Sequence, residues 1–225
     1  MIALIDADIV AYRVGFTTEE EPEAIAAWRA DELMQSILAE TGATEYKAFL
    51  TGEGNFRRKV NALYKANRTK PKPVHLPFLT KHLVEKWGAV VVNGMEADDY
   101  LAINQEDNTI ICSIDKDLLT VPGKHYNFVK KEFVDIDYLT GLRKFYKQFL
   151  IGDVADNIIG IKGIGPVGAS GYIDHLYTEL EMFNIVRELY NDDDRLLMNG
   201  ICLYMKRTLD DDWTGTYNFL LGETN

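Results

Sequence analysis

Acidic residues recur at the points where predicted strands of this chain end. Asp6 closes an apolar run, three acids open the segment after the run 89–92, and two more follow the run 109–114. These six residues are Asp6, Glu96, Asp98, Asp99, Asp115 and Asp117. Since the carboxyl ends of parallel strands meet at one edge of an open α/β sheet, we expect all six carboxylates at that edge. Carboxylates gathered there repel one another unless cations lie among them.

The donor types indicate which cation would bind. Hard oxygen ligands without His or Cys select Mg²⁺ or Mn²⁺. Two such ions, about 3.5–4 Å apart, activate water and stabilise the leaving oxygen in phosphodiester hydrolysis. Asp153 and Asp156 add a further pair, and their spacing of three puts both on one face of a helical turn. Each acid taken alone also has a simpler structural explanation. Asp6 can cap a helix, and Glu96 can complement the dipole at a helix N-terminus. Asp8 is interpreted as a helix cap.

Positive charge is concentrated in one segment. The formal net charge is −11, yet residues 54–84 contain eight Lys or Arg and no Asp or Glu. A basic segment on an acidic body indicates a bound polyanion beside a site that needs carboxylates, and the alternative is a solvated basic helix. Lys65 and Arg68 are three residues apart, so on a helix they share a face and reach one phosphate. Lys70 and Lys72 lie in a proline-rich loop, where we expect them only to steer a polyanion's backbone.

A glycine-rich segment lies in the second half of the chain. Gly163, Gly165 and Gly168 match the dinucleotide-binding pattern G-x-G-x-x-G literally, but no strand precedes them. Pro166 suits the first turn of a following helix. The pattern favours a helix–hairpin–helix, whose glycines let backbone N–H groups approach a DNA phosphate without reading its sequence. A plain structural turn is the remaining alternative.

Strand and helix patterns alternate through the first half. Strands are predicted at 1–6, 46–51, 89–92 and 109–114, and helices at 23–40, 77–87 and 96–105. This alternation predicts a parallel sheet covered by helices on both faces. Helical patterns dominate after Asp137. We therefore expect an α/β core over residues 1–137, with the basic segment at about 54–84, and a helical region over residues 138–225.

Composition excludes several classes of protein. With 225 residues, 47% of them hydrophobic and 26% charged, the chain is neither disordered nor too small for its own core. No apolar run is long enough to cross a bilayer, and Met1 opens on an apolar run without the basic region of a signal peptide. Cys112 and Cys202 lie far apart and the four histidines are scattered, which fits a reducing cytosol and no zinc site.

Five motifs occur in an order that resembles the 5′-nuclease, or flap endonuclease, superfamily. They are LIDAD, FRRKVNALYKANR, GMEADD, SIDKDL and GDVADNIIGIKGIGPVGA, within residues 1 to about 175. The chain is similar to the small 5′→3′ exonucleases of tailed bacteriophages, which are related to the 5′-nuclease domain of bacterial DNA polymerase I. The resemblance implies a PIN-like parallel-sheet core with a helical arch or loop and a C-terminal helix–hairpin–helix region.

The resemblance also implies roles for individual residues. The six strand-end acids would hold two metal ions, with Asp153 and Asp156 serving the second. Lys65 and Arg68 would contact the scissile phosphate, and Tyr64 would lie near the terminal nucleotide. The hairpin would also bind K⁺ through backbone carbonyls between Gly160 and Gly165. The expected DNA contacts are Tyr64, Arg57, Lys70, Lys72, Lys162, Gly163, Gly165 and Gly168.

Two features depart from the family pattern. The family carries an aspartate a few residues before the FR of its second motif, whereas this chain reads TGEGNFRR. Either Glu53 substitutes for it, or the ligand is absent and Gly52 occupies its position. The stretch from Arg68 to Pro77 is also short for a fully helical arch that threads a free end.

The implied function is a Mg²⁺-dependent 5′→3′ DNA exonuclease or structure-selective flap endonuclease that leaves 5′-phosphate products and serves DNA replication. Its partners would be DNA with 5′ ends, flaps or nicks, including RNA/DNA primers. We expect a monomer without a membrane partner, in the cytoplasm, or in the host cytoplasm for a phage-encoded chain. The alternatives are a PIN-like ribonuclease, which needs no grip on duplex DNA, and a catalytically silent DNA-structure-binding protein.

Overall fold

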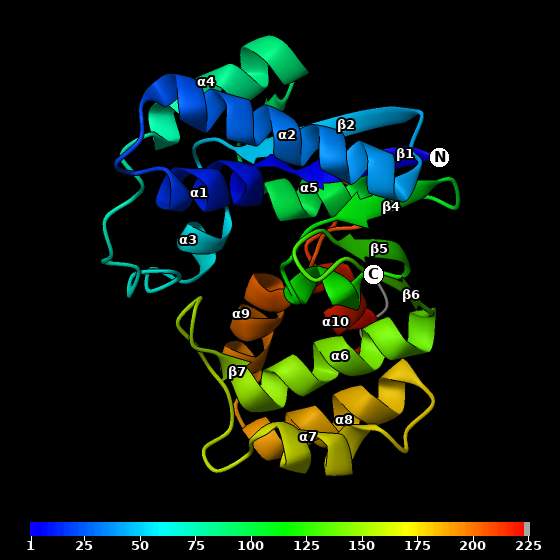
Figure 1. Cartoon of the computed structure of the whole chain (residues 1–225). Helices are drawn as coiled ribbons and strands as arrows, with labels where there is room; N and C mark the ends of the chain where they lie inside the picture. The colour runs from blue at the N-terminus through cyan, green and yellow to red at the C-terminus, as the bar shows by residue number, and fades with distance from the viewer. Residues whose placement is uncertain (223–225) are drawn as a thin grey trace. The chain divides into compact units, whose positions relative to one another are not determined.

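A six-stranded sheet is the centre of the first half of the chain in the computed structural model, which describes residues 1–222 (Figure 1). Its strands, in the order β3-β2-β1-β4-β5-β6, are β1 (Ile2–Asp6), β2 (Glu45–Thr51), β3 (Val90–Val92), β4 (Thr109–Cys112), β5 (Gly123–Asn127) and β6 (Glu132–Ile136). β1 pairs in parallel with β2 and β4, β2 with β3, and β4 with β5. The predicted parallel sheet is confirmed, and strands β1 to β5 present their carboxyl ends at one edge.

Alternate residues of the strands are buried by different helices. These are α1 (Ala7–Thr17), α2 (Glu23–Thr41), α4 (Leu76–Trp87) and α5 (Ala97–Ile103). Ile5 and Leu50 belong to the hydrophobic core that α1, α2 and α4 share. Phe49 points to the other face, where its ring meets Tyr100 of α5 at a centroid distance of 5.4 Å. Because side chains alternate along a strand, Asp6, the register partner of Phe49, lies on the α5 face.

The chain divides into two compact units. The sheet unit comprises residues 1–55, 70–118 and 123–135, and the helical unit comprises residues 56–69, 119–122 and those from Ile136 on. The sequence placed residues 56–69 in the α/β core, whereas the structure places them in the helical unit. The reason is packing, since Tyr64 is 3% exposed within the aromatic core of that unit.

The helical unit is built around long helices and a short hairpin. Its elements are α3 (Arg57–Val60), α6 (Tyr138–Ile151), β7 (Gly152–Asp153), β8 (Ile158–Ile159), α7 (Pro166–Ile173), α8 (Glu179–Tyr190), α9 (Asp193–Leu203) and α10 (Thr214–Leu221), and the 3₁₀ turn η1 (Asp117–Thr120) runs into it. Phe145, Phe149 and Trp213 stack edge to face or tilted in its core, with ring centroids 5.1–5.6 Å apart. Trp213 lies on Gly200 so closely that a Cβ there would overlap its ring.

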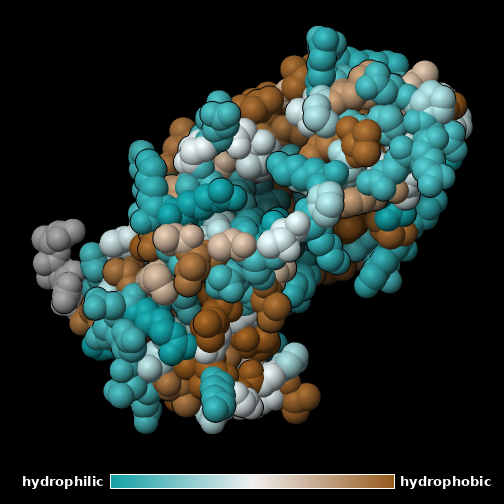
Figure 2. All heavy atoms as spheres, turned by 90° about the vertical axis from the view of Figure 1, so that its left-hand side faces the viewer, coloured by the Kyte–Doolittle hydropathy of each residue, from teal (hydrophilic) through white to brown (hydrophobic). Residues whose placement is uncertain are grey.

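Several hydrophobic side chains of the helical unit are exposed to solvent. Val154, Ile159 and Val167 of the helical unit are 87%, 76% and 89% exposed. Figure 2 shows hydrophobic residues as brown patches within a mainly hydrophilic, teal surface on the face it presents. Within residues 1–222, no helix combines the length and the apolar character needed to cross a bilayer.

We predict that Gly200→Ala destabilises the protein by about 1–3 kcal/mol, because the new methyl group must displace the buried Trp213 ring. Urea denaturation followed by tryptophan fluorescence measures the change. Gly215→Ala in α10 is the matched control, since nothing lies within 4 Å of its added Cβ, and we expect it to change the unfolding free energy by less than about 0.5 kcal/mol. Equal stability of the two variants would show that the ring does not require the glycine.

Candidate active site

Asp6 ends the central strand of the sheet, and the strand register determines its neighbours. Ile5 pairs with Cys112 of β4, so the next residue, Ser113, comes beside Asp6. Ser113 Oγ donates to Asp6 Oδ2 at 2.6 Å, and the Ile9 amide donates to Oδ1 at 3.1 Å, which makes Asp6 the N-cap of α1. The side chain is only 2% exposed. The cap role considered for Asp6 is therefore real, and it holds the carboxylate at the strand edge.

The electrostatics of Asp6 indicate a place for a cation. The pKa of Asp6 is raised to about 7, and burial is the largest cause. The negative charges of Asp8 and Asp115 also raise this pKa, whereas the hydrogen bonds from Ser113 and the Ile9 amide lower it. Two other acids are thus near enough to act on the same carboxylate. A divalent cation there would favour the ionised form of Asp6 over the protonated one.

Glu96 and Asp99 build the start of α5. Glu96 is the N-cap, its side chain accepts from the Asp99 amide, and Asp99 Oδ2 accepts from the Glu96 amide at 3.2 Å. Thr51 Oγ1, at the end of β2, accepts from the Ala97 amide at 2.9 Å, so the helix start is tied to the strand edge. Asp99 is fully buried and Asp98 half-buried. The helix N-terminal role considered for Glu96 is therefore real, and Asp99 shares it through the capping box.

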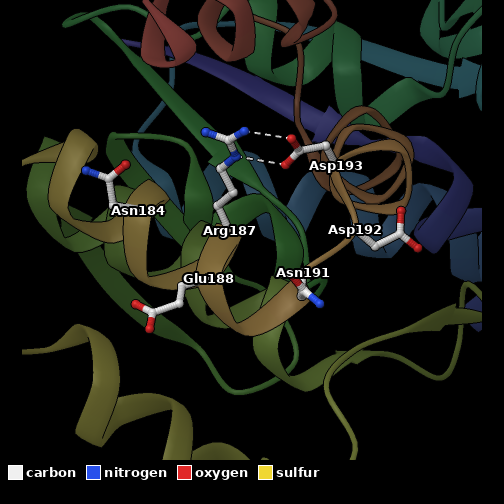
Figure 3. Close-up of a pocket in the computed structure, with 6 residues that line it drawn as sticks. All are labelled: Asn184, Arg187, Glu188, Asn191, Asp192 and Asp193. Atoms are coloured by element: carbon white, nitrogen blue, oxygen red, sulfur yellow. Dashed lines mark hydrogen bonds and ion pairs between the residues drawn. The ribbon is translucent and has the colours of Figure 1, made fainter.

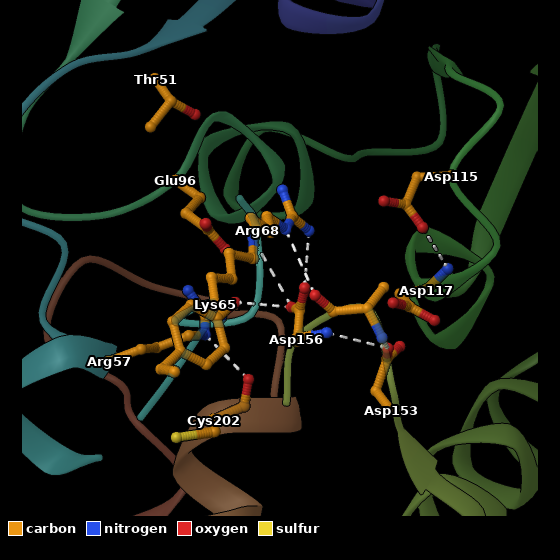
Figure 4. Close-up of polar contacts among 12 residues, drawn as sticks. Thr51, Arg57, Lys65, Arg68, Glu96, Asp115, Asp117, Asp153, Asp156 and Cys202 are labelled. Carbon is orange, nitrogen blue, oxygen red and sulfur yellow. Dashed lines mark hydrogen bonds and ion pairs between the residues drawn. The ribbon is translucent and has the colours of Figure 1, made fainter. Parts of the chain in front are cut away.

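The loop after β4 orders the next two acids. Ser113 Oγ accepts from the Asp115 amide at 3.0 Å. Asp115 Oδ1 accepts from the Asp117 amide at 2.8 Å (Figure 4). Ser113 therefore organises both Asp6 and the Asp115 loop. Asp8, which the sequence interpreted as a cap, instead accepts from the Thr51 amide at 3.0 Å through Oδ2.

The loop after β2 explains the departure from the second motif. The Glu53 amide donates to Asn93 Oδ1 at 2.9 Å, and the Gly94 amide donates to the Glu53 carbonyl at 2.7 Å. A Cβ at Gly52 would overlap Asn93 and crowd Val92. Position 52 therefore has no room for a carboxylate, and Glu53, which is exposed, is the acid of this loop.

The donor chemistry of the sheet edge fits a hard divalent cation. Carboxylates and the hydroxyls of Thr51 and Ser113 are the groups that gather at the strand ends, and such oxygens suit Mg²⁺ or Mn²⁺ rather than Zn²⁺. Within residues 1–222, no three His, Cys, Asp or Glu side chains already stand in the arrangement of a closed metal centre. The edge therefore offers ligands that a cation would draw together.

Asp153 and Asp156 lie in the helical unit, in a turn rather than on a helix. α6 ends at Ile151 because Gly152 adopts a left-handed φ of 75°, and Asp153 Oδ1 then accepts from the Ala155 and Asp156 amides at 2.7 and 3.1 Å. The predicted helical turn is wrong, since these two hydrogen bonds close a tight turn between β7 and β8.

Lys65 and Arg68 meet at the Asp156 carboxylate. Lys65 Nζ lies 3.5 Å from Oδ2, and Arg68 Nη2 lies 2.6 Å from Oδ1 (Figure 4). Tyr64 donates its hydroxyl to Oδ2 at 2.8 Å. The expected helix is wrong, because this segment is a series of turns with Lys65 at a φ of 56°. Both cations still converge on one anionic group.

Two asparagines that the sequence analysis missed join this basic segment to the 152–158 turn. Asn67 Nδ2 donates to the Val154 carbonyl at 2.6 Å, and Asn157 Nδ2 donates to the Leu63 carbonyl at 2.9 Å. Asn157 has a φ of 59°, a left-handed conformation that Asn adopts more readily than most residues. The sequence feature that could have indicated this contact is Asn157, which directly follows Asp156.

Two expected DNA contacts are corrected by burial. Arg57 is 1% exposed, and it donates from Nε to the Cys202 carbonyl at 2.9 Å and from Nη2 to the Tyr204 carbonyl at 2.6 Å. Tyr64 packs in the core of the helical unit, so its ring does not face solvent. Lys70 and Lys72 are exposed, as predicted for a loop.

The glycine-rich segment forms a hairpin that leads into α7. Lys162, Gly163 and Gly165 are exposed, Gly163 has a φ of 88°, and no atom lies within 4 Å of a Cβ built at Gly163 or Gly165. Gly165 is the N-cap of α7, with Pro166 in its first turn. Gly168 is exposed in the same turn. The residues before the hairpin belong to the two-stranded β7–β8 sheet, so the dinucleotide alternative lacks its βαβ unit.

A polar hollow lies elsewhere in the helical unit, between the end of α8 and the start of α9. It is lined by Asn184, Arg187, Glu188, Asn191, Asp192 and Asp193 (Figure 3). Arg187 donates to both carboxylate oxygens of Asp193, at 2.8 and 2.7 Å. None of its residues was predicted as a site residue.

Comparison with known proteins agrees with this architecture. No family model matches the chain. A 5′-3′ exonuclease of Mycoplasma genitalium is 28% identical over 237 residues, which cover 86% of this chain and 80% of that protein. A bacteriophage T5 protein co-crystallised with metal ions matches 100% of this chain and 99% of its own with a TM-score of 0.67, at 16% identity. The resemblance to the 5′-nuclease superfamily is confirmed.

The 5′-nuclease relatives include much longer proteins. DNA polymerase I of Borreliella burgdorferi is 34% identical over 156 residues, which are 57% of this chain and 17% of the polymerase. The chain therefore spans less than a fifth of that relative's length. A bacteriophage T5 flap endonuclease solved with DNA and metal ions shares the fold at a TM-score of 0.60 and 16% identity, covering 99% of this chain and 98% of its own. The expected class, a nuclease of the hydrolases, agrees with the names of these relatives.

We predict that Arg57→Met lowers the free energy of unfolding by at least about 2 kcal/mol, because two carbonyls lose donors at about 1–3 kcal/mol each. Arg58→Met removes the same charge from an exposed neighbour and serves as the control, with an expected change below about 0.5 kcal/mol. Urea denaturation measures both. If Arg57→Met weakened DNA binding with unchanged stability, Arg57 would be a DNA contact after all.

Proposed function

We propose that this chain is a divalent-metal-dependent 5′-nuclease that hydrolyses phosphodiester bonds near the 5′ ends of DNA and leaves 5′-phosphate products. The observation that carries the proposal is the sheet edge, where acids follow β1, β3 and β4 and the buried Asp6 feels the charges of Asp8 and Asp115. Such an edge is the usual place of an active site in an open α/β sheet.

The residues that would hold the metal are the acids of this edge and the pair in the helical unit. They are Asp6, Glu96, Asp98, Asp99, Asp115 and Asp117, with Asp153 and Asp156 assigned to a second Mg²⁺ or Mn²⁺ ion. When bound, the two ions supply a nucleophilic water at neutral pH and neutralise charge on the leaving oxygen. Ser113 keeps Asp6 and the Asp115 loop in place through its two hydrogen bonds.

Lys65 and Arg68 are proposed to act on the phosphate. Their present partner, the Asp156 carboxylate, shows that both can reach one anionic group at the same time. A phosphate oxygen that takes the place of this carboxylate would receive a bidentate arginine and a point charge from lysine. Charge that develops on the phosphate in the transition state would thereby be stabilised.

The hairpin at Gly163–Gly165, Lys162 and the first turn of α7 are proposed to grip the DNA backbone. Exposed backbone N–H groups contact phosphates without reading bases, and the exposed Lys70 and Lys72 add sequence-independent attraction. A PIN-like ribonuclease does not need such a grip on duplex DNA.

The proposed substrates are DNA with 5′ ends, flaps or nicks, and they include RNA/DNA primers. We propose that the chain acts as a monomer in the cytoplasm, or in the host cytoplasm if a phage encodes it.

We predict that Asp115→Asn abolishes cleavage of 5′-labelled duplex, nicked and flapped DNA in Mg²⁺ while DNA binding persists. The loss should exceed the ~100-fold that removal of an outer-shell partner of a metal typically costs. Asp107→Asn is the control, because Asp107 is exposed and precedes β4 at the opposite end of the same strand.

The same assay separates the alternatives. Mononucleotide products indicate an exonuclease, and longer fragments indicate a flap endonuclease. Cleavage that continues in EDTA, or equal activity of the Asp115 and Asp107 variants, contradicts the metal assignment. Matched RNA cleaved faster than DNA would favour the ribonuclease.

We predict that Lys65→Ala lowers the single-turnover rate at saturating enzyme by about 100-fold, since it removes one donor to the transition state, while DNA affinity measured in Ca²⁺ changes little. Lys72→Ala should do the reverse, with an unchanged rate and weaker binding whose salt slope falls by about one unit. Equal rates for the two variants would reduce Lys65 to part of a solvated basic face.

A further inference from the structure

The first carbonyl of the segment where the family resemblance implies a K⁺ ion, that of Gly160, is bound by a side chain of this protein. Arg195 donates from Nη2 to the Gly160 carbonyl at 2.6 Å and to the Ile159 carbonyl at 3.3 Å. Asn199 donates from Nδ2 to the same Ile159 carbonyl at 3.0 Å. A fixed cation therefore lies at the start of the segment that leads into the hairpin.

Further carbonyls of the 160–165 segment serve the chain's own amides. The Ile161 carbonyl accepts from the Ile164 amide at 3.1 Å, and the Gly165 carbonyl accepts from the Ala169 amide at 2.9 Å. A K⁺ ion in a protein is held by several carbonyl oxygens that replace its hydration shell. With the Gly160 carbonyl bound to a guanidinium, a second positive charge there would also be repelled. The donor set does not fit K⁺.

Arg195 is held in place by a buried network. It lies in the first turn of α9, whose N-cap Asp192 accepts from the Arg195 amide at 3.0 Å. The guanidinium carbon lies 4.7 Å from the centre of the Tyr190 ring. The Tyr190 hydroxyl accepts from Asn199 Nδ2 at 2.9 Å and donates to the Phe149 carbonyl at 2.8 Å. The Tyr190 ring thus anchors the arginine, and Asn199 holds both Tyr190 and the Ile159 carbonyl that it shares with Arg195.

The contact restrains the backbone just before the hairpin. Gly160 packs so closely on Gly152 that a Cβ at either position would overlap the other's backbone. The Ile161 amide donates to the Leu150 carbonyl at 2.8 Å, at the end of α6. Gly160 therefore lies between the end of α6, which contacts its backbone, and the start of α9, whose Arg195 binds its carbonyl.

We propose that Arg195, stacked on Tyr190, takes the place of a monovalent cation and positions the hairpin for the DNA backbone, so that the grip on DNA does not require K⁺. The inference rests on the proposed function in that the hairpin is taken to bind duplex DNA. Arg195 is a positioning residue, because its guanidinium is directed to backbone carbonyls.

The test compares DNA binding in KCl and NaCl at equal concentration, by fluorescence anisotropy of labelled nicked duplex with Ca²⁺ in place of Mg²⁺. The wild-type chain should bind equally in both salts, within about twofold, because no carbonyl cage selects between the ions. Arg195→Met should weaken binding at least about fivefold. Arg195→Lys should restore only part of the affinity, because lysine keeps the charge but lacks the planar guanidinium that contacts two carbonyls and the Tyr190 ring.

Arg187→Met is the matched control. Arg187 is on the neighbouring helix α8, its ion pair with Asp193 is exposed, and its loss removes the same charge. We expect a change of less than about twofold in DNA affinity. The proposal is overturned if wild-type binding is clearly tighter in KCl than in NaCl, or if Arg195→Met and Arg187→Met bind alike.

A second measurement does not depend on DNA. The melting temperature of the wild-type chain, followed as NaCl is exchanged for KCl at constant total salt, should not change, and a rise specific to K⁺ overturns the inference. The same scan shows whether Arg195→Met is folded. Absence of DNA binding by the wild type in both salts would contradict the proposed function alone, because the melting test of Arg195 still stands.

Discussion

The burial of one carboxylate at the end of the central strand is the constraint on which the candidate site depends. β1 lies between β2 and β4, so Asp6 at its carboxyl end is flanked on both sides and shielded from water. Ionising such a group costs free energy unless hydrogen bonds or cations compensate. Ser113 and the Ile9 amide compensate in part, while Asp8 and Asp115 increase the cost. The sheet topology therefore creates a site whose charge balance favours a bound divalent cation.

In the helical unit, a carboxylate and several backbone carbonyls are paired with side chains of the same unit. The Asp156 carboxylate is met by Lys65, Arg68 and Tyr64, and the carbonyls of Ile159 and Gly160 are met by Arg195 and Asn199. Arg57 satisfies the carbonyls of Cys202 and Tyr204 at the end of α9. Cations of this unit thus hold backbone in place, and only some of the positive charge in the basic segment is available to a polyanion.

Features that depend on local pattern could be read from the sequence. Strands β1 to β4 and the acids after them were predicted, because apolar runs and the parallel arrangement follow from neighbouring residues. Strands β5 and β6 were not predicted. The capping roles of Asp6 and Glu96 were also visible from position alone. The conformation of Lys65 and Arg68 was not, because their segment takes its shape from bonds to residues 87–94 positions away. Arg57 was misread for the same reason, since its partners lie 145 and 147 positions along the chain.

The central claim, that the strand-end acids bind the divalent ion, is tested most directly by metal binding itself. Titration of the DNA-free protein with Mn²⁺, followed by electron paramagnetic resonance, counts bound ions and gives their affinity. We expect Asp6→Asn to weaken Mn²⁺ binding by more than about tenfold, because it removes a buried carboxylate at the end of the central strand, while Asp107→Asn should leave it unchanged. Unaltered Mn²⁺ binding by the Asp6 variant would contradict the account.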